Sequence, residues 1–264
     1  MSISVALAGK GGTGKTTLCA LIIRSLIEEG KTPVLALDAD PNSNLNEVLG
    51  VKITKTVGSL REEFKRDAPR YSKGMYKDQI VEMNIHQALV EGNGFDLLAM
   101  GRGEGPGCYC YANTLFRKYI DVLQENYNWV VMDNEAGMEH LSRRTTRDID
   151  FLLIVSDFSP KGILTASRIR DLALELKLKI GRILLIVNRV NSELDVKLIE
   201  SIKKTGLEIL SCVNLDASIS EMDLSGESIF DLPSNSIALT QVKCFVRKLV
   251  SEIGELKGDW LKKG

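Results

Sequence analysis

Residues 9–16, Gly-Lys-Gly-Gly-Thr-Gly-Lys-Thr, match every position of the pattern G-x-x-x-x-G-K-[ST], a backbone cradle for phosphate groups. The glycines let the chain curl so that its N–H groups point at phosphate oxygens, and the helix that follows adds unsatisfied N–H donors. In such a loop Lys15 reaches the β- and γ-phosphates, and the Thr16 hydroxyl ligates Mg²⁺. The residues expected to bind a nucleotide here are Gly11, Gly12, Thr13, Gly14, Lys15, Thr16 and Thr17.

Three carboxylates follow apolar runs elsewhere in the chain. Asp38 and Asp40 come at the end of residues 33–40, and Asp133 closes residues 129–133. Carboxylates at strand ends beside a phosphate loop can hold the waters of Mg²⁺ or orient an attacking water. An apolar strand ending in aspartate is typical of the second magnesium-binding motif of phosphate-loop proteins, so we expect Asp133 to hold Mg²⁺ through water.

The chain has five cysteines, an odd and sparse set that argues against a disulfide framework. Cys108 and Cys110 stand one residue apart, so in an extended chain their thiols point the same way. A two-fold axis through such a pair would give a four-sulfur site that suits Zn²⁺, Cu⁺ or Ni²⁺. Taken alone, the pair is also compatible with two unrelated thiols. We expect Cys19, Cys212 and Cys244 to be small buried hydrophobic residues.

Short apolar runs alternate with longer segments of helical period. This alternation predicts an α/β fold of three layers: a mostly parallel sheet of seven or eight strands with helices on both faces. Ligands bind at the carboxyl ends of such strands. The expected strands are residues 2–9, 33–40, 95–101, 129–133, 150–157, 182–190 and 207–213. The expected helices are residues 15–30, 112–126, 161–177, 195–204 and 237–253.

Length and charge limit the kind of protein. The 264 residues suit one phosphate-loop domain over residues 1–264, in which residues 52–93, rich in Lys, Arg and Glu, form a surface insertion of short helices and loops. A formal net charge of −1 gives no global attraction to nucleic acid or to an anionic membrane. No leader pattern follows Met1, and no apolar run approaches the ~20 residues that span a bilayer. We therefore expect a cytoplasmic protein that binds neither nucleic acid nor membrane.

A second lysine inside the loop, Lys10, makes the sequence resemble the deviant Walker A (SIMIBI) family of dimeric P-loop ATPases. This family includes partition and septum-site ATPases and the nitrogenase iron protein. The resemblance implies a homodimer in which Lys10 crosses the two-fold interface to the phosphates of the partner's nucleotide. It also implies that Asp40 orients the attacking water and that Asp38 is a supporting carboxylate near Mg²⁺. The catalytic residues expected on this basis are Lys10, Lys15 and Asp40.

The residues 188–191, Asn-Arg-Val-Asn, indicate the base. They follow a strand where GTPases of this superfamily carry Asn-Lys-x-Asp, and the aspartate that would pair with guanine is missing. Asn188 suits the adenine amino group and ring nitrogen, as in the deviant ATPases, so ATP and ADP are the expected nucleotides. The sequence departs from the family at residues 212–214, where the family often has a proline.

The Cys108–Cys110 pair sharpens the resemblance. Together with the strand that ends in Asp133 and the following Glu139-His140-Leu141, it is similar to the CooC-type nickel-insertion ATPases, which mature carbon monoxide dehydrogenase and acetyl-CoA synthase. This similarity implies that the two cysteines bind Ni²⁺ or Zn²⁺ between protomers. It further implies that ATP closes the dimer, that hydrolysis opens it, and that nickel is delivered to one of these client enzymes.

Two other functions remain open at this point. An electron donor like the nitrogenase iron protein would hold an iron–sulfur cluster across the dimer, and a partition or septum-positioning ATPase would need no metal on its cysteines. Glu135 as a second catalytic carboxylate and His140 as a further metal ligand are also open.

Overall fold

A computed structural model of the protein describes residues 2–40, 42, 44–67, 77–101, 118, 120–134, 148–191 and 196–263. Its described strands form one eight-stranded sheet in the order β3-β4-β2-β5-β1-β6-β7-β8. Neighbouring strands are parallel except for the β3–β4 pair. The strands are β1 (Ile3–Gly9), β2 (Val34–Asp38), β3 (Val90–Glu91), β4 (Phe95–Ala99), β5 (Trp129–Asp133), β6 (Asp148–Ser156), β7 (Lys179–Val190) and β8 (Glu208–Asn214). This confirms the predicted three-layer α/β fold.

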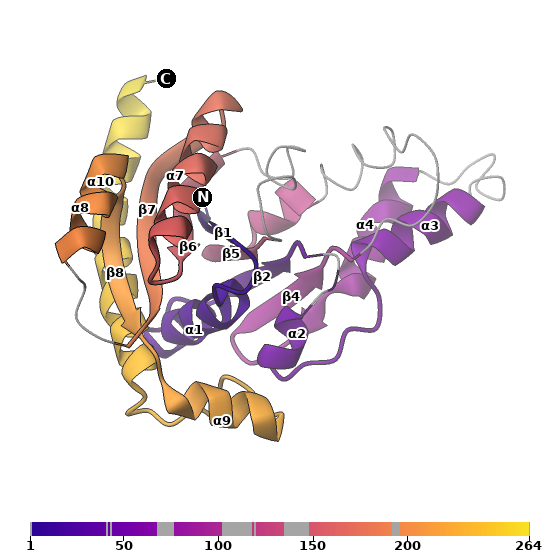
Figure 1. Ribbon diagram of the computed structural model, residues 1–264. Coiled ribbons are helices and arrows are strands. Elements are labelled where there is room, and N and C mark those ends of the chain that lie inside the picture. The colour runs from indigo at the N-terminus through magenta and orange to yellow at the C-terminus, as the bar shows by residue number, and fades with distance from the viewer. Residues whose placement is uncertain are drawn as a thin grey trace.

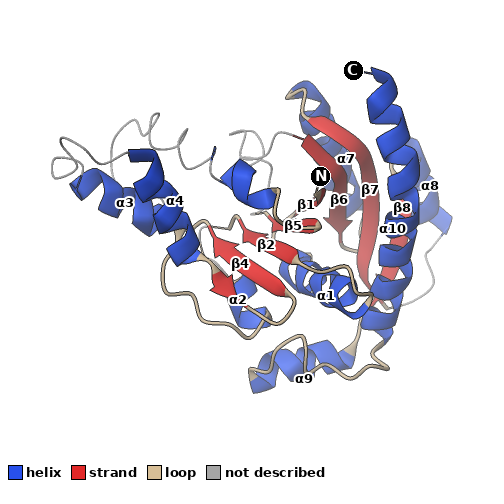
Figure 2. Cartoon of the chain, turned by 180° about the vertical axis from the view of Figure 1, so that it is seen from behind, coloured by secondary structure: helices blue, strands red, loops and turns tan. Residues whose placement is uncertain are grey.

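Helices cover both faces of the sheet (Figures 1 and 2). Successive residues of a strand point to opposite faces, and β1 has apolar residues on both, so Val5 packs on one side and Ala6 on the other. The helices on the Val5 side are α1 (Lys15–Glu28), α2 (Leu45–Val48), α9 (Ala217–Ser225) and α10 (Ile237–Lys263). Those on the Ala6 side are α3 (Val57–Asp67), α4 (Lys77–Ala88), α7 (Pro160–Glu175) and α8 (Val196–Thr205).

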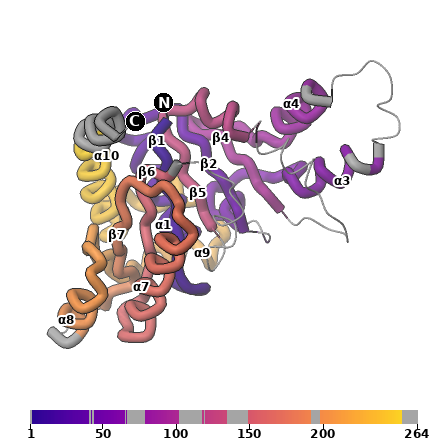
Figure 3. Tube along the Cα trace, turned by 90° about the horizontal axis from the view of Figure 1, so that it is seen from above, coloured from indigo at the N-terminus to yellow at the C-terminus, as the bar shows by residue number. Residues whose placement is uncertain are grey.

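The segment 52–93 differs from a surface insertion. It contains helices, as expected, but α3 and α4 bury an apolar side against the sheet and join the core on the Ala6 side. The residues buried in this way are Val57, Leu60, Phe64, Ile80, Val81, Ile85 and Ala88. Seen from above, the two helices lie at the opposite end of the molecule from α10 (Figure 3). The many charged residues between the apolar ones concealed their helical spacing.

Helix α10 packs on the protein through its apolar side, as predicted. Val242, Phe245 and Leu249 are fully buried, whereas Ile237 at the start of the helix is 55% exposed. Cys19 is buried as expected, but the prediction was wrong for Cys244, which is exposed on α10 next to the buried stripe. No helix in the described part of the chain is long and apolar enough to cross a membrane.

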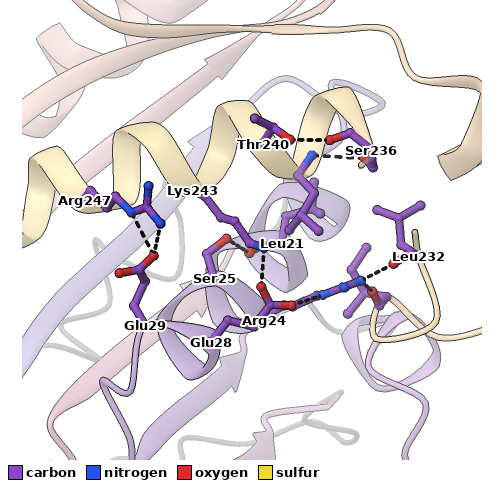
Figure 4. A network of polar contacts seen from close by, with 12 residues as sticks. Leu21, Arg24, Ser25, Glu28, Glu29, Leu232, Ser236, Thr240, Lys243 and Arg247 are labelled. Atoms are coloured by element: carbon purple, nitrogen blue, oxygen red, sulfur yellow. Dashed lines mark hydrogen bonds and ion pairs between the residues drawn. The ribbon is translucent and has the colours of Figure 1, made fainter. Parts of the chain in front are cut away.

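Polar contacts join α10 to α1 (Figure 4). Glu28 of α1 accepts from Lys243 of α10 and from Arg24 one turn earlier, and Arg247 binds Glu29 just after α1. The Arg24 guanidinium is nearly buried and also donates to the carbonyl oxygens of Ile229 (2.6 Å) and Leu232 (2.7 Å). These contacts fix the helix that begins at the phosphate pattern.

Candidate nucleotide site

The phosphate pattern lies at the carboxyl end of β1, one of the central strands, between Gly9 and the start of α1 at Lys15. Two of its glycines are required by the geometry. A Cβ on Gly9 would lie 2.3 Å from the Val155 carbonyl oxygen. Gly14 has a φ of 86°, and a Cβ there would lie 2.6 Å from Nδ2 of Asn188. Larger side chains at either position would push the loop off the sheet.

Lysine and carbonyl groups hold the loop in shape. The buried Lys15 ammonium donates to the carbonyl oxygens of Gly9 (3.3 Å) and Lys10 (3.2 Å). The Thr13 hydroxyl also donates to the Lys10 carbonyl oxygen, at 2.9 Å. Lys10 itself is exposed. One lysine of the loop is therefore buried among the loop's own carbonyl groups, and the other is exposed to solvent.

Asp133 and Asp38 end the neighbouring strands β5 and β2 and are register partners. Burial raises the pKa of Asp133 to about 6, although a hydrogen bond from the Thr16 hydroxyl and the nearby Lys15 charge act in the opposite direction. Its Oδ1 atom is buried without a hydrogen-bond partner among the described residues. A buried carboxylate oxygen with spare capacity, beside a threonine hydroxyl, is a donor set that fits a hard cation such as Mg²⁺.

Asp38 is completely buried, but its two oxygen atoms both have partners. Oδ1 accepts from the Asp40 amide at 3.0 Å, and Oδ2 accepts from the Leu45 amide at 3.1 Å. Burial raises its pKa to about 7, and the nearby Asp133 charge adds to this effect. Asp40, which is partly exposed, accepts from the Asn42 amide at 2.8 Å. The structure thus brings three carboxylates to the edge of the sheet that carries the phosphate loop.

Asn188 and Arg189 both contact the loop from the end of β7. Asn188 Nδ2 donates to the Thr13 carbonyl oxygen (2.8 Å), and Arg189 Nη1 donates to that of Gly12 (3.0 Å). Consecutive strand residues normally point to opposite faces. Here the β7–β8 register shifts between Asn188 and Val190, and Arg189 has a φ of 57°. The irregularity turns both side chains toward the phosphate loop.

Arg189 and Asn134 were not predicted as site residues. Asn134 follows Asp133 and donates to the Leu7 carbonyl oxygen at 2.8 Å, which ties β5 to β1 beside the loop. The only sequence signal for either residue was its place directly after a predicted site residue. The structure brings together the predicted Lys15, Thr16, Asp38, Asp40, Asp133 and Asn188. Cys108, Cys110, Glu135 and His140 lie outside the described residues.

Comparisons with known proteins also indicate that the chain binds a nucleotide. Residues 4–229 match the family model described as the CobQ/CobB/MinD/ParA nucleotide binding domain. An uncharacterized ATP-binding protein of Methanocaldococcus jannaschii, MJ0685, is 40% identical over 94% of this chain and 98% of its own. The carbon monoxide dehydrogenase accessory protein CooC of Rhodospirillum rubrum is 30% identical over 97% of this chain and 99% of its own.

Solved structures share the fold. The MinD cell division protein of Aquifex aeolicus in its complex with MinC superposes with a TM-score of 0.69 at 23% identity, covering 95% of this chain and 96% of its own. A ParA family ATPase from Chlorobium tepidum gives a TM-score of 0.70 at 20% identity, with 93% and 97% covered. The phosphate loop and the family match over residues 4–229 lead to one conclusion. The chain belongs to the CobQ/CobB/MinD/ParA nucleotide-binding family and is a P-loop ATPase.

Proposed function

We propose that this ATPase is a metallochaperone that inserts nickel into the active-site cluster of a carbon monoxide dehydrogenase or an acetyl-CoA synthase. The observation that carries the proposal is the 30% identity to the carbon monoxide dehydrogenase accessory protein CooC, which extends over 97% of this chain. The Cys108–Cys110 pair supports it, since paired thiolates are ligands that Ni²⁺ and Zn²⁺ both accept. Nickel is the cargo of the reaction in this proposal.

ATP binds at the loop between β1 and α1. The loop amides receive the phosphates, and the Lys15 ammonium exchanges its present acceptors, the carbonyl oxygens of Gly9 and Lys10, for phosphate oxygens. Asn188 uses its amide nitrogen to hold Thr13, which leaves its carbonyl oxygen to accept from the adenine amino group. Asp40 orients the attacking water. Mg²⁺, held by Thr16 and through water by Asp133, would neutralise charge on the transferred phosphate.

The exposed Lys10 supports a homodimer. An exposed lysine in the phosphate loop can contact phosphates bound by a second copy of the chain. Positive charge supplied there stabilises the transition state of phosphoryl transfer. The same two-fold axis would bring Cys108 and Cys110 of both protomers into one four-thiolate site. Hydrolysis removes the γ-phosphate, which releases the contacts that hold the dimer closed, and the metal is handed to the client.

The test is an anaerobic titration of Ni²⁺ into the protein with ADP or ATP present. Thiolate-to-nickel charge-transfer absorption and particle mass are followed together. We expect one metal per dimer in the wild type, none in the variant Cys108→Ser with Cys110→Ser, and wild-type behaviour in the control Cys244→Ser, which alters an exposed cysteine on α10. Nickel binding that does not depend on Cys108 and Cys110 would refute the metallochaperone assignment.

The same preparation distinguishes the other functions. A broad visible absorption band in anaerobically purified protein, lost in the double-cysteine variant, would indicate an iron–sulfur cluster and an electron donor. ATP hydrolysis with neither cluster nor cysteine-dependent metal binding would favour a positioning ATPase.

A further inference from the structure

The carboxylate of Asp38 occupies an unusual position at the end of β2. The backbone on either side of it is already fixed by the sheet. The Ala39 amide donates to the Asp133 carbonyl oxygen (2.9 Å), and the Met100 amide donates to the carbonyl oxygen of Asp38 (2.8 Å). The side chain is fully buried and holds two further amides, those of Asp40 and Leu45. The backbone of Asp38 is therefore fixed in the sheet, and its side chain accepts hydrogen bonds from two amides of the chain that follows.

Leu45, one of the two residues whose amides Asp38 accepts from, is the first residue of α2. Asn44, at the cap position of this helix, makes no side-chain capping hydrogen bond. The Leu45 amide, which as the first amide of the helix has no acceptor within it, donates to Asp38. The other end of α2 is fixed as well. The Val48 carbonyl oxygen accepts from the Ile229 amide at 2.8 Å, and Arg24 of α1 holds the Ile229 carbonyl oxygen. The short helix is thus fastened at both ends.

The other amide that donates to Asp38 is that of Asp40, the residue expected to orient the attacking water. The amide nitrogen of a residue and its side chain share one Cα atom, so fixing the amide limits where the carboxylate can lie. We propose that Asp38 is a positioning residue for ATP hydrolysis, which sets the place of the Asp40 carboxylate by holding the amides of Asp40 and Leu45. This inference rests on the ATPase activity and does not depend on nickel delivery.

The proposal predicts a particular kinetic pattern. Displacing a catalytic group by about 1 Å costs on the order of 100-fold in rate. Loss of the Asp38 carboxylate should therefore lower kcat by roughly 10- to 100-fold, while KM for ATP changes by less than about 3-fold, since the phosphate loop is untouched. The amides of Asp40 and Leu45 should lose their protection from hydrogen exchange in the same variant.

The experiment compares Asp38→Asn with Asp40→Asn. Asp38→Asn keeps the shape of the side chain but places an N–H donor against one of the two amides. Asp40→Asn removes the proposed water-orienting charge and leaves both amides bonded to Asp38. Steady-state ATP hydrolysis is measured over ATP and Mg²⁺ concentrations, and single-residue amide exchange is followed by NMR. The exchange rates of the amides in strand β1 show whether each variant is folded.

We expect both variants to lose kcat and only Asp38→Asn to exchange faster at Asp40 or Leu45. Unchanged exchange at both amides, together with a higher Mg²⁺ requirement, would show that Asp38 acts through the metal and would overturn the proposal. The wild-type protein gives a further test that needs no variant. If its Asp40 and Leu45 amides exchange as fast as exposed amides do, the two hydrogen bonds do not position anything.

Discussion

Two buried aspartates, Asp133 and Asp216, contrast sharply. Asp133 ends β5 at the nucleotide site and has one oxygen atom without a partner among the described residues. Asp216 caps α9, and both of its oxygen atoms are engaged. Oδ1 accepts from the Ser218 amide (3.0 Å) and hydroxyl (2.7 Å), and Oδ2 accepts from the Ser236 hydroxyl (2.6 Å) and the Ala238 amide (3.1 Å).

The electrostatics of the two residues follow from these partners. Burial raises the pKa of Asp133 to about 6. Burial acts in the same direction on Asp216, but its hydrogen bonds from Ser236 and Ser218 outweigh it and lower the pKa to about 2. A carboxylate that serves the fold receives its donors from the protein, whereas a carboxylate that serves the site keeps capacity for a ligand. The comparison therefore separates residues that stabilise the structure from residues that act on ATP.

The largest effect is expected from Lys15→Ala. The Lys15 ammonium bonds to loop carbonyl groups and is expected to contact the phosphates, so its loss should reduce ATP hydrolysis by about 1,000-fold or more, which corresponds to ~4 kcal/mol. The exposed Lys248 provides the control Lys248→Ala, which should keep full activity. Turnover retained in Lys15→Ala would remove the phosphate-loop assignment.

Asp133→Asn tests whether Asp133 binds a ligand rather than stabilising the fold. The amide keeps the size of the side chain but removes the charge that fits Mg²⁺, and we expect hydrolysis to fall about 100-fold, or ~2.7 kcal/mol. The free energy of unfolding without nucleotide should stay the same or rise, because a buried charge with spare capacity is removed. Urea titration measures it, and a clear loss of stability would mean that Asp133 holds the fold.

Asp216→Asn should give the opposite result. One oxygen atom that now accepts two hydrogen bonds would become an N–H₂ donor facing donors, so the free energy of unfolding should fall by about 2 kcal/mol. The rate of ATP hydrolysis, measured well below the melting temperature, should remain near that of the wild type. A variant that is fully stable but inactive would place Asp216 in the site instead.

The smallest effect concerns pH. The pKa of Asp133 is raised from its ordinary value of 3.8 to about 6 in the folded protein, so its contribution to stability is complete below about pH 4 and is lost as the pH rises through about 6. Asp216 has the opposite sign: its contribution is present above about pH 4 and is lost as the pH falls through about 2. Relative to wild type, nucleotide-free Asp133→Asn should therefore gain on the order of 1 kcal/mol between about pH 4 and about pH 7. Urea titrations at several pH values measure this difference, which should be absent for Asp216→Asn in that range.

Much of the fold could be predicted from the sequence because strand and helix periods are local. Seven strands were expected close to their observed places, and the eighth, β3, has only two residues, too few for a period to show. Helix α9 was also missed, since its apolar residues do not follow one face: Leu224 is 89% exposed and Met222 is buried. The position of the phosphate pattern between a strand and a helix could be predicted, because the pattern lies in eight consecutive residues.

The remaining contacts of the site join residues far apart in the chain. The bond from Asn188 to the Thr13 carbonyl oxygen spans 175 residues and depends on the irregular pairing of β7 with β8. The motif around Asn188 indicates a role toward the base but not that the Asn188 side chain also holds the phosphate loop. Likewise, the spacing from Asp38 to Leu45 does not reveal that one carboxylate holds both Asp40 and Leu45. Such contacts follow from the packed structure alone.

The attachment of α1 to α10 has a consequence for how the protein is made. The helix that begins at Lys15 is synthesised long before α10, because Arg247, the partner of Glu29, lies 218 residues after it. Until α10 has left the ribosome, the apolar side of α1 lacks the helix that covers it in the folded protein. A nascent chain can thus form the central strands before it can complete the helix behind the phosphate loop. We therefore expect ATP binding to require that α10 has been synthesised.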